Sequence, residues 1–143
     1  MLSLGQVTTR AARFLLIAVA LVHVVIPAIM WWQRGQLHDQ IARSNPDLPP
    51  AGVDGAVQIA LIAAAVFHAV FAILNVWLTR RLGAGRGRIA TTVVQLLAAV
   101  FSIVSWRSSP MFHAVIPVVT ALELLTVVLV WLPSRDTRRS ATP

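Results

Sequence analysis

The 143-residue chain contains no cysteine and no lysine, and only 12% of its residues are charged. The lack of cysteine excludes disulfide bonds, thiolate metal sites, iron–sulfur clusters and thiol nucleophiles. The charged fraction is about half of the roughly 25% that is usual in soluble domains. Because 57% of the residues are apolar and the mean hydropathy is +0.77, a water-soluble fold is not expected. The length fits one compact unit without a separate soluble catalytic domain.

Four apolar runs are separated by polar segments. A bilayer core about 30 Å thick is crossed by roughly 17–25 helical residues. Backbone groups in lipid must find hydrogen-bond partners within their own segment, so each run should be a helix. The sequence therefore predicts an all-α membrane protein, a four-transmembrane-helix bundle that forms a single domain over residues 1–143. The predicted spans are about residues 14–32, 56–78, 89–106 and 114–132.

The aromatic and basic residues indicate where the spans end and which way they run. Each tryptophan lies at the edge of an apolar run, as expected for side chains at a membrane–water interface. These residues are Trp31, Trp32, Trp77, Trp106 and Trp131. Nine of the twelve basic residues would lie on one side: Arg10, Arg13, Arg80, Arg81, Arg86, Arg88, Arg135, Arg138 and Arg139. The three on the other side are Arg34, Arg43 and Arg107.

The positive-inside rule places the side with nine arginines in the cytoplasm, so both chain ends are expected there. The expected location is the cytoplasmic (plasma) membrane, with the lipid bilayer as the first partner. The net charge of +7 is then a signal of topology, and no nucleic-acid partner is expected. Anionic lipid head groups are the expected partners of the cytoplasmic arginines.

Each predicted span carries one polar residue near its midpoint: His23, His68, Gln95 and Glu123. An ionisable residue at that depth is a hypothesis for a functional site, because its burial in lipid is unfavourable. In the second span, small residues recur every four positions together with His68 and form a packing ridge. The ridge consists of Ala56, Ala60, Ala64 and Ala72.

Three interpretations of this midplane polar layer stay open. The residues can act as interhelical hydrogen-bonding groups that hold the bundle together. They can form a proton- or ion-coupled pathway, because histidines and carboxylates are the groups that proton relays use. His23 and His68 can also serve as the two axial ligands of a haem. No metal site is predicted, because burial at mid-membrane argues against zinc even though the ligand types would fit.

Catalytic chemistry has little support in the sequence, and no catalytic residue is predicted. His38 and Asp39 are adjacent, so on a helix their side chains would diverge by about 100°. The glycines between Gly83 and Gly87 follow a helix and not a strand, which argues against a nucleotide-binding loop. The expected role is that of a non-enzymatic accessory subunit, in a homo-oligomer or a larger membrane complex.

Two segments carry a resemblance to a group of known proteins. One runs from Arg80-Arg81-Leu82-Gly83 to Arg88-Ile89-Ala90, and the other is Val130-Trp131-Leu132-Pro133-Ser134. Together they resemble small four-span membrane proteins of actinobacteria. The resemblance implies a cytoplasmic membrane location and four spans. It implies no activity, because the function of those proteins is largely unknown.

Overall fold

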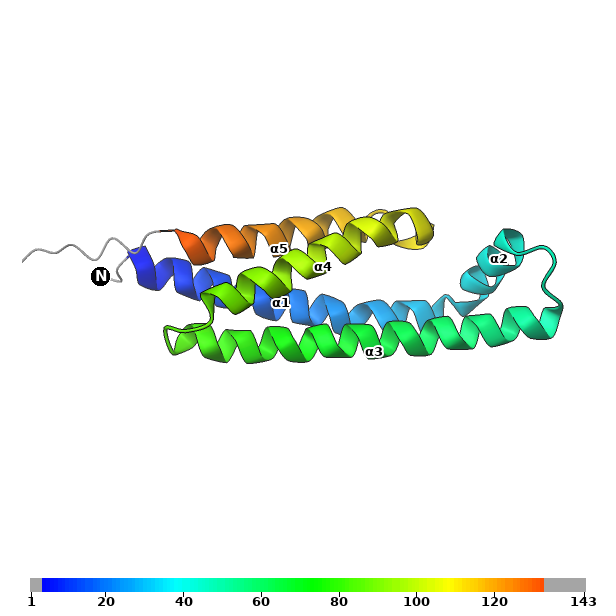
Figure 1. The fold of residues 1–143 in the computed structure, drawn as a ribbon, viewed down its shortest axis with the longest axis horizontal. Coiled ribbons are helices and arrows are strands. Elements are labelled where there is room, and N and C mark those ends of the chain that lie inside the picture. Colours follow the sequence, from blue (N-terminus) through cyan, green and yellow to red (C-terminus); the bar gives the residue numbers. More distant parts are fainter. Residues whose placement is uncertain (1–3, 133–143) are drawn as a thin grey trace, which may run out of the picture. The chain divides into compact units, whose positions relative to one another are not determined.

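The computed structural model describes residues 4–132, and all of the regular secondary structure in this range is helical. The predicted all-α fold is thus confirmed, and Figure 1 shows the order of the helices. They are α1 (Leu4–Trp32), α2 (Arg34–Ser44), α3 (Pro50–Gly83), α4 (Arg88–Ser108), the short 3-10 helix η1 (Pro110–Phe112) and α5 (Val115–Trp131).

Three helices are long and apolar enough to cross a membrane, as three of the four predicted spans require. They cover Gly5–Trp32, Pro50–Gly83 and Arg88–Trp106. Both α1 and α3 extend beyond the apolar runs, because polar residues next to a run can continue the same backbone hydrogen-bond pattern. The helix of the fourth predicted span, α5, is apolar but has only 17 residues. Arg135, Arg138 and Arg139, with Pro133 and Ser134, lie outside the described residues.

The chain divides into two compact units, and α1 and α3 contribute to both. Unit 1 comprises the described residues of Met1–Val19 and Leu74–Pro143, and unit 2 comprises Ala20–Ile73. In unit 1, α4 and α5 pack against each other, as expected from the short connection between them. The ring of His113 stacks on that of Trp106, and its Nε2–H donates a 2.7 Å hydrogen bond to the Trp106 carbonyl oxygen. These contacts tie the end of α4 to the turn into α5.

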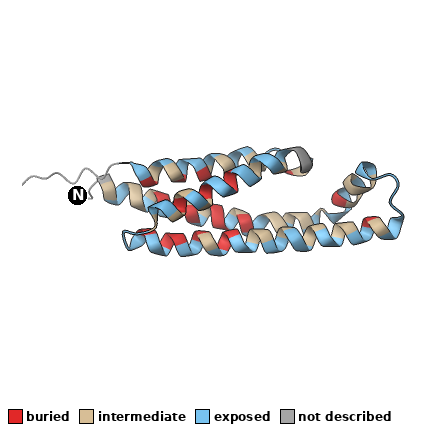
Figure 2. Ribbon diagram, viewed as in Figure 1, coloured by how far each residue is buried: buried red, intermediate tan, exposed pale blue. Residues whose placement is uncertain are grey.

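The apolar core of unit 1 lies where α1, α3 and α5 meet. In α1 and α3 its buried members are spaced i and i+4, which places each pair on one helix face. They are Ala12 and Leu16 from α1, Leu78 and Leu82 from α3, and Val130 from α5. Residues of α4 and α5 pack against this cluster from the side, namely Ala90, Val94 and Leu129. Figure 2 shows buried residues on inward faces and exposed residues on the outside of these helices.

The distribution of polarity is the reverse of that in a soluble protein. Asn75, Gln95 and Glu123 have no exposed surface, whereas many large apolar side chains are more than half exposed. All five tryptophans are exposed, by 40–88%. Lipid would cover apolar outward faces without a penalty, while water would not. The fold is therefore that of a membrane protein.

Candidate functional site

A hydrogen bond between side chains in unit 2 joins two of the predicted layer residues. His23 of α1 and His68 of α3 lie with their Nδ1 atoms 2.8 Å apart, so one Nδ1 carries a hydrogen and donates it to the other. The ring centroids are 5.1 Å apart and the planes differ by 41°. His23 is 4% exposed, and the surrounding helix positions are apolar. The pair is thus a hydrogen-bonded bridge between two apolar helices.

Two phenylalanines of α3 border the histidine pair. Phe71 stacks on His23 with a centroid distance of 5.4 Å, and Phe67 meets the His68 ring edge-on at the same distance. The two phenylalanine rings also contact each other, at 4.8 Å. The two apolar rings lower the polarity of the surroundings of the imidazoles. A hydrogen bond is electrostatically stronger in such surroundings than in water.

A second polar contact lies in unit 1 between α3 and α4. The Nε2 of Gln95 donates a 2.8 Å hydrogen bond to Oδ1 of Asn75, and both residues are fully buried. One turn further along α3, the hydroxyl of Thr79 donates to the Asn75 carbonyl oxygen. Gln95 was predicted as a layer residue from its midpoint position. Its partner Asn75 was not, because it lies near the end of the predicted span.

The four predicted layer residues fall in both units. His23 and His68 belong to unit 2 and are brought together, while Gln95 and Glu123 belong to unit 1. Glu123 is fully buried in α5, one turn before the buried Thr126. A single layer of all four residues stays a prediction. In the predicted packing ridge, Ala72 is buried, and Ala56, Ala60 and Ala64 are partly buried.

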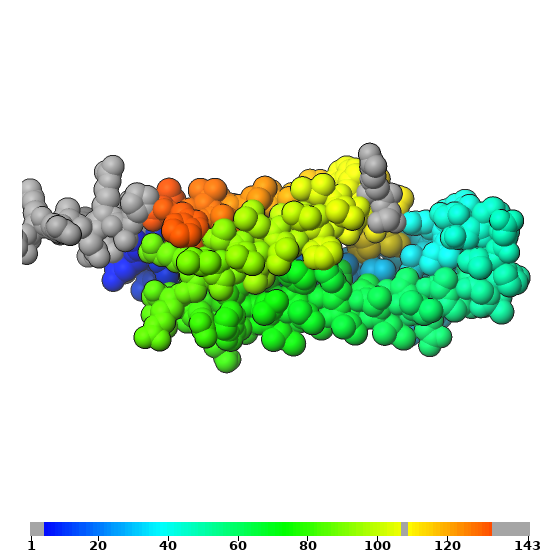
Figure 3. All heavy atoms as spheres, in the orientation of Figure 1, coloured from blue at the N-terminus to red at the C-terminus, as the bar shows by residue number. Residues whose placement is uncertain are grey.

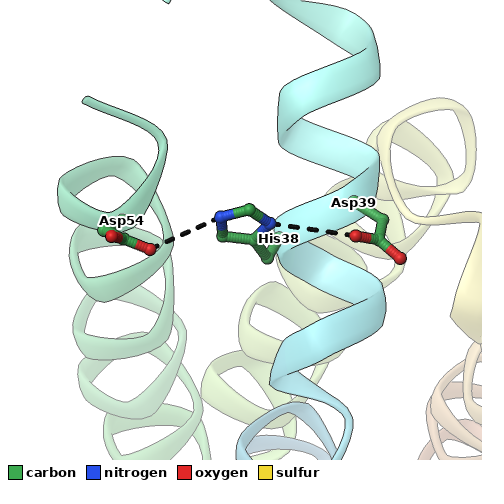
Figure 4. Close-up of polar contacts among 3 residues, drawn as sticks. All are labelled: His38, Asp39 and Asp54. Carbon is green, nitrogen blue, oxygen red and sulfur yellow. Dashed lines mark ion pairs between the residues drawn. The ribbon is translucent and has the colours of Figure 1, made fainter. Parts of the chain in front are cut away.

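A third polar group lies in unit 2, between α2 and the start of α3. The imidazole of His38 lies between two carboxylates (Figure 4). Its Nε2 is 3.4 Å from Oδ1 of Asp54, and its Nδ1 is 3.8 Å from Oδ1 of Asp39. All three side chains are at least 41% exposed. The sequence spacing argued against joint action of His38 and Asp39, and it gave no signal for Asp54 across the loop.

The described residues include no group of three or more histidines and carboxylates that could hold a metal ion. For haem, one nitrogen of each histidine must lie on opposite sides of the iron. A metal-bound imidazole nitrogen lies about 2 Å from its metal, so two such nitrogens would be about 4 Å apart. The Nδ1 atoms of His23 and His68 are in direct contact at 2.8 Å. Haem ligation by this pair requires the rings to separate, and it stays a prediction.

Buried polar contacts between helices with apolar outer faces define the class, an all-helical membrane protein. In comparisons with known proteins, no family model matches the chain, and neither a curated protein nor a solved structure matches it. The resemblance to small actinobacterial membrane proteins therefore stays a prediction. What the protein does is inferred below from its own contacts.

Proposed function

We propose that the chain is a four-span protein of the cytoplasmic membrane with both ends in the cytoplasm. We further propose that it works without catalysis, as a subunit of a small oligomer or of a larger membrane complex. The fourth span would be α5, whose 17 residues are about 26 Å long and approach the roughly 30 Å bilayer core. Arginines at the start of α1 and around the α3–α4 loop support this orientation.

The observation that carries the proposal is a folded segment outside the predicted spans. At 1.5 Å per residue, the 34 residues of α3 are about 51 Å long, which exceeds the roughly 40–45 Å of a bilayer with its head groups. Because the predicted span begins only at residue 56, the part of α3 that precedes it, together with α2, would lie outside the apolar core of the membrane. In this outer segment, defined as Arg34–Gly55, Leu37 and Val53 are buried, and His38 contacts Asp54.

An outer segment with its own buried residues presents polar side chains in fixed positions. A surface of this kind can recognise a partner with little loss of conformational freedom on binding. The hydrogen bonds of Gln95 with Asn75 and of His23 with His68 hold helices together, which is a structural use of polar groups in membrane helices. Both features support an assembly role over a chemical one.

The experiment uses the absence of cysteine in the chain. A Gln36→Cys variant places one thiol on the exposed face of α2. Thiol cross-linking in native membranes should give a species heavier than the monomer, and native mass measurement in mild detergent should give the same assembly. A Gln36→Cys/Leu37→Asp variant, which disturbs the buried side of α2, should lose the cross-link. A lone monomer in both measurements would contradict the proposal.

A second candidate function is a proton-coupled pathway, and the contact between His23 and His68 favours it. Two imidazoles joined by one hydrogen can pass a proton from α1 to α3, and histidine and carboxylate side chains are the usual relay groups in membranes. In proteoliposomes, His68→Ala and Glu123→Gln should each abolish a pH-dependent flux, while His38→Ala should retain it. Absence of flux in the wild-type protein, or flux unchanged by these variants, would count against this function.

A further inference from the structure

The loop between α3 and α4 is folded tightly against the end of α3. Gly85 and Gly87 have φ values of 72° and 93°, which lie in the left-handed region that glycine adopts without strain. The N–H of Arg86 donates a 3.0 Å hydrogen bond to the carbonyl oxygen of Arg81. A Cβ atom on Gly87 would be only 3.0 Å from the Cβ of Arg81. The loop therefore has a defined shape and holds its arginines close to the last turn of α3.

A further arginine reaches the same place from α1. The guanidinium of Arg13 lies against Gly83, the last residue of α3, with Cζ 3.2 Å and Nη1 3.3 Å from the position that a Cβ would occupy. A larger residue at position 83 would displace this group. Gly83 thus provides the space in which Arg13 joins the arginines of the loop. The exposed surface at the end of α3 is visible in Figure 3 (green).

The positive charge of the arginines around the end of α3 is not balanced by nearby carboxylates in the described part of unit 1. The arginines near the start of α1 and around the α3–α4 loop are exposed: Arg10, Arg13, Arg80, Arg81, Arg86 and Arg88. The one carboxylate among the described residues of this unit is Glu123, which is buried within α5. The cluster, called here the α3–α4 basic site, consists of Arg13, Arg81, Arg86 and Arg88. It is complementary to an anion.

The position of Trp77 indicates the source of that anion. The guanidinium of Arg81 lies over the indole of Trp77, 4.4 Å from the ring centroid. Tryptophan in a membrane helix lies at head-group depth. An arginine held on its face is therefore expected at the depth of lipid phosphates, and its cation is attracted to the face of the ring.

We propose that the α3–α4 basic site binds the phosphate of an anionic phospholipid, with Arg13 positioned for this by its contact with Gly83. The proposal requires the chain to lie in a membrane, but it does not depend on the number of spans or on assembly with partners. It differs from general attraction of arginines to an anionic surface, because it assigns a role to an uncharged residue, Gly83.

The test measures lipid binding to the full-length chain by native mass spectrometry in detergent, read on the monomer peak. The probes are phosphatidylglycerol and phosphatidylcholine with identical acyl chains. Wild type should retain phosphatidylglycerol preferentially. Arg13→Gln should weaken that binding about fivefold, the factor that corresponds to roughly 1 kcal/mol per basic residue near an anionic surface. Arg43→Gln removes the same charge from α2 and should leave the binding unchanged.

The decisive variant is Gly83→Leu, which changes no charge. Its Cβ would be 3.2 Å from Cζ of Arg13, and the rest of the side chain needs the space beside it, so the guanidinium must move and lipid binding should fall. Gly55→Leu is the matched control, because it lies in the same helix and its Cβ would have no atom within 4 Å.

Three results would overturn the proposal. One is equal binding of the two lipids by the wild-type chain. Another is equal behaviour of Gly83→Leu and Gly55→Leu, which would leave only diffuse attraction to the head groups. The third is displacement of phosphatidylglycerol by an equal concentration of inorganic phosphate, which would assign the site to a free anion. Because the readout is the monomer, none of these results depends on whether the chain assembles with partners.

Discussion

Gln95 of α4 donates a hydrogen bond from Nε2 to Oδ1 of Asn75 of α3 over 2.8 Å, and neither side chain has any exposed surface. Most side chains of the two helices near this contact are apolar, so the two amides would lose this hydrogen bond in a different alignment of α3 and α4. An unpaired polar group in a membrane interior is unfavourable, which limits the alignments that the helices can adopt. This contact therefore fixes how α4 lies along the end of α3.

Substitution of Asn75 should destabilise the protein, because the buried amide of Gln95 then loses its hydrogen-bond acceptor. We expect Asn75→Leu to lower the free energy of unfolding by about 1–2 kcal/mol, the range for interhelical hydrogen bonds in membranes and for a buried group left unpaired. The measurement is reversible unfolding in mixed micelles. Gln58→Leu, at an exposed position of α3, should have little effect.

The double variant Asn75→Leu/Gln95→Leu isolates the contact itself. If the two amides act as a pair, the second substitution should destabilise much less than the first, because the partner has already been lost. Strictly additive losses would show that the hydrogen bond contributes nothing to the stability of the fold.

The orientation of the chain can be measured with single cysteines, because the natural chain has none. We expect Ser44→Cys, at the end of α2, to react with a membrane-impermeant maleimide in intact cells. Ala84→Cys, in the α3–α4 loop, should react only after the membrane is opened, since the arginines around it favour the cytoplasm. Ala65→Cys, an exposed position within α3, should be protected by lipid in both conditions. Labelling of Ala84→Cys in intact cells would reverse the orientation.

Much of the fold could be predicted from sequence because hydropathy and helical spacing depend on local chemistry. The need to satisfy backbone groups in lipid predicts the helices, and midpoint polar residues predict buried positions. In the structure His23, Gln95 and Glu123 are buried, and His68 is partly buried. The hydrogen-bond partner of a polar residue could not be predicted in this way, because it depends on how the helices lie against each other. Asn75 appears as the partner of Gln95 only in three dimensions.

The outer segment and the α3–α4 basic site could not be predicted from the sequence either, for the same reason. Nothing in the apolar run at 56–78 indicates that the helix starts at Pro50, because hydropathy marks lipid contact and not the end of backbone hydrogen bonding. The contact of Arg13 with Gly83 joins residues far apart in the chain. Charge counting could place both arginine groups on one side of the membrane, but it could not identify the glycine that gives Arg13 its position.

The absorption spectrum of the purified protein tests the haem alternative for His23 and His68. Because their Nδ1 atoms are in contact at 2.8 Å, we expect no Soret band in the wild-type protein as isolated. We also expect none after incubation with haemin and removal of the excess. A His68→Ala variant, which lacks one of the two ligands, is the control for nonspecific haem uptake. A Soret band in the wild type that His68→Ala abolishes would show that the rings separate to bind iron.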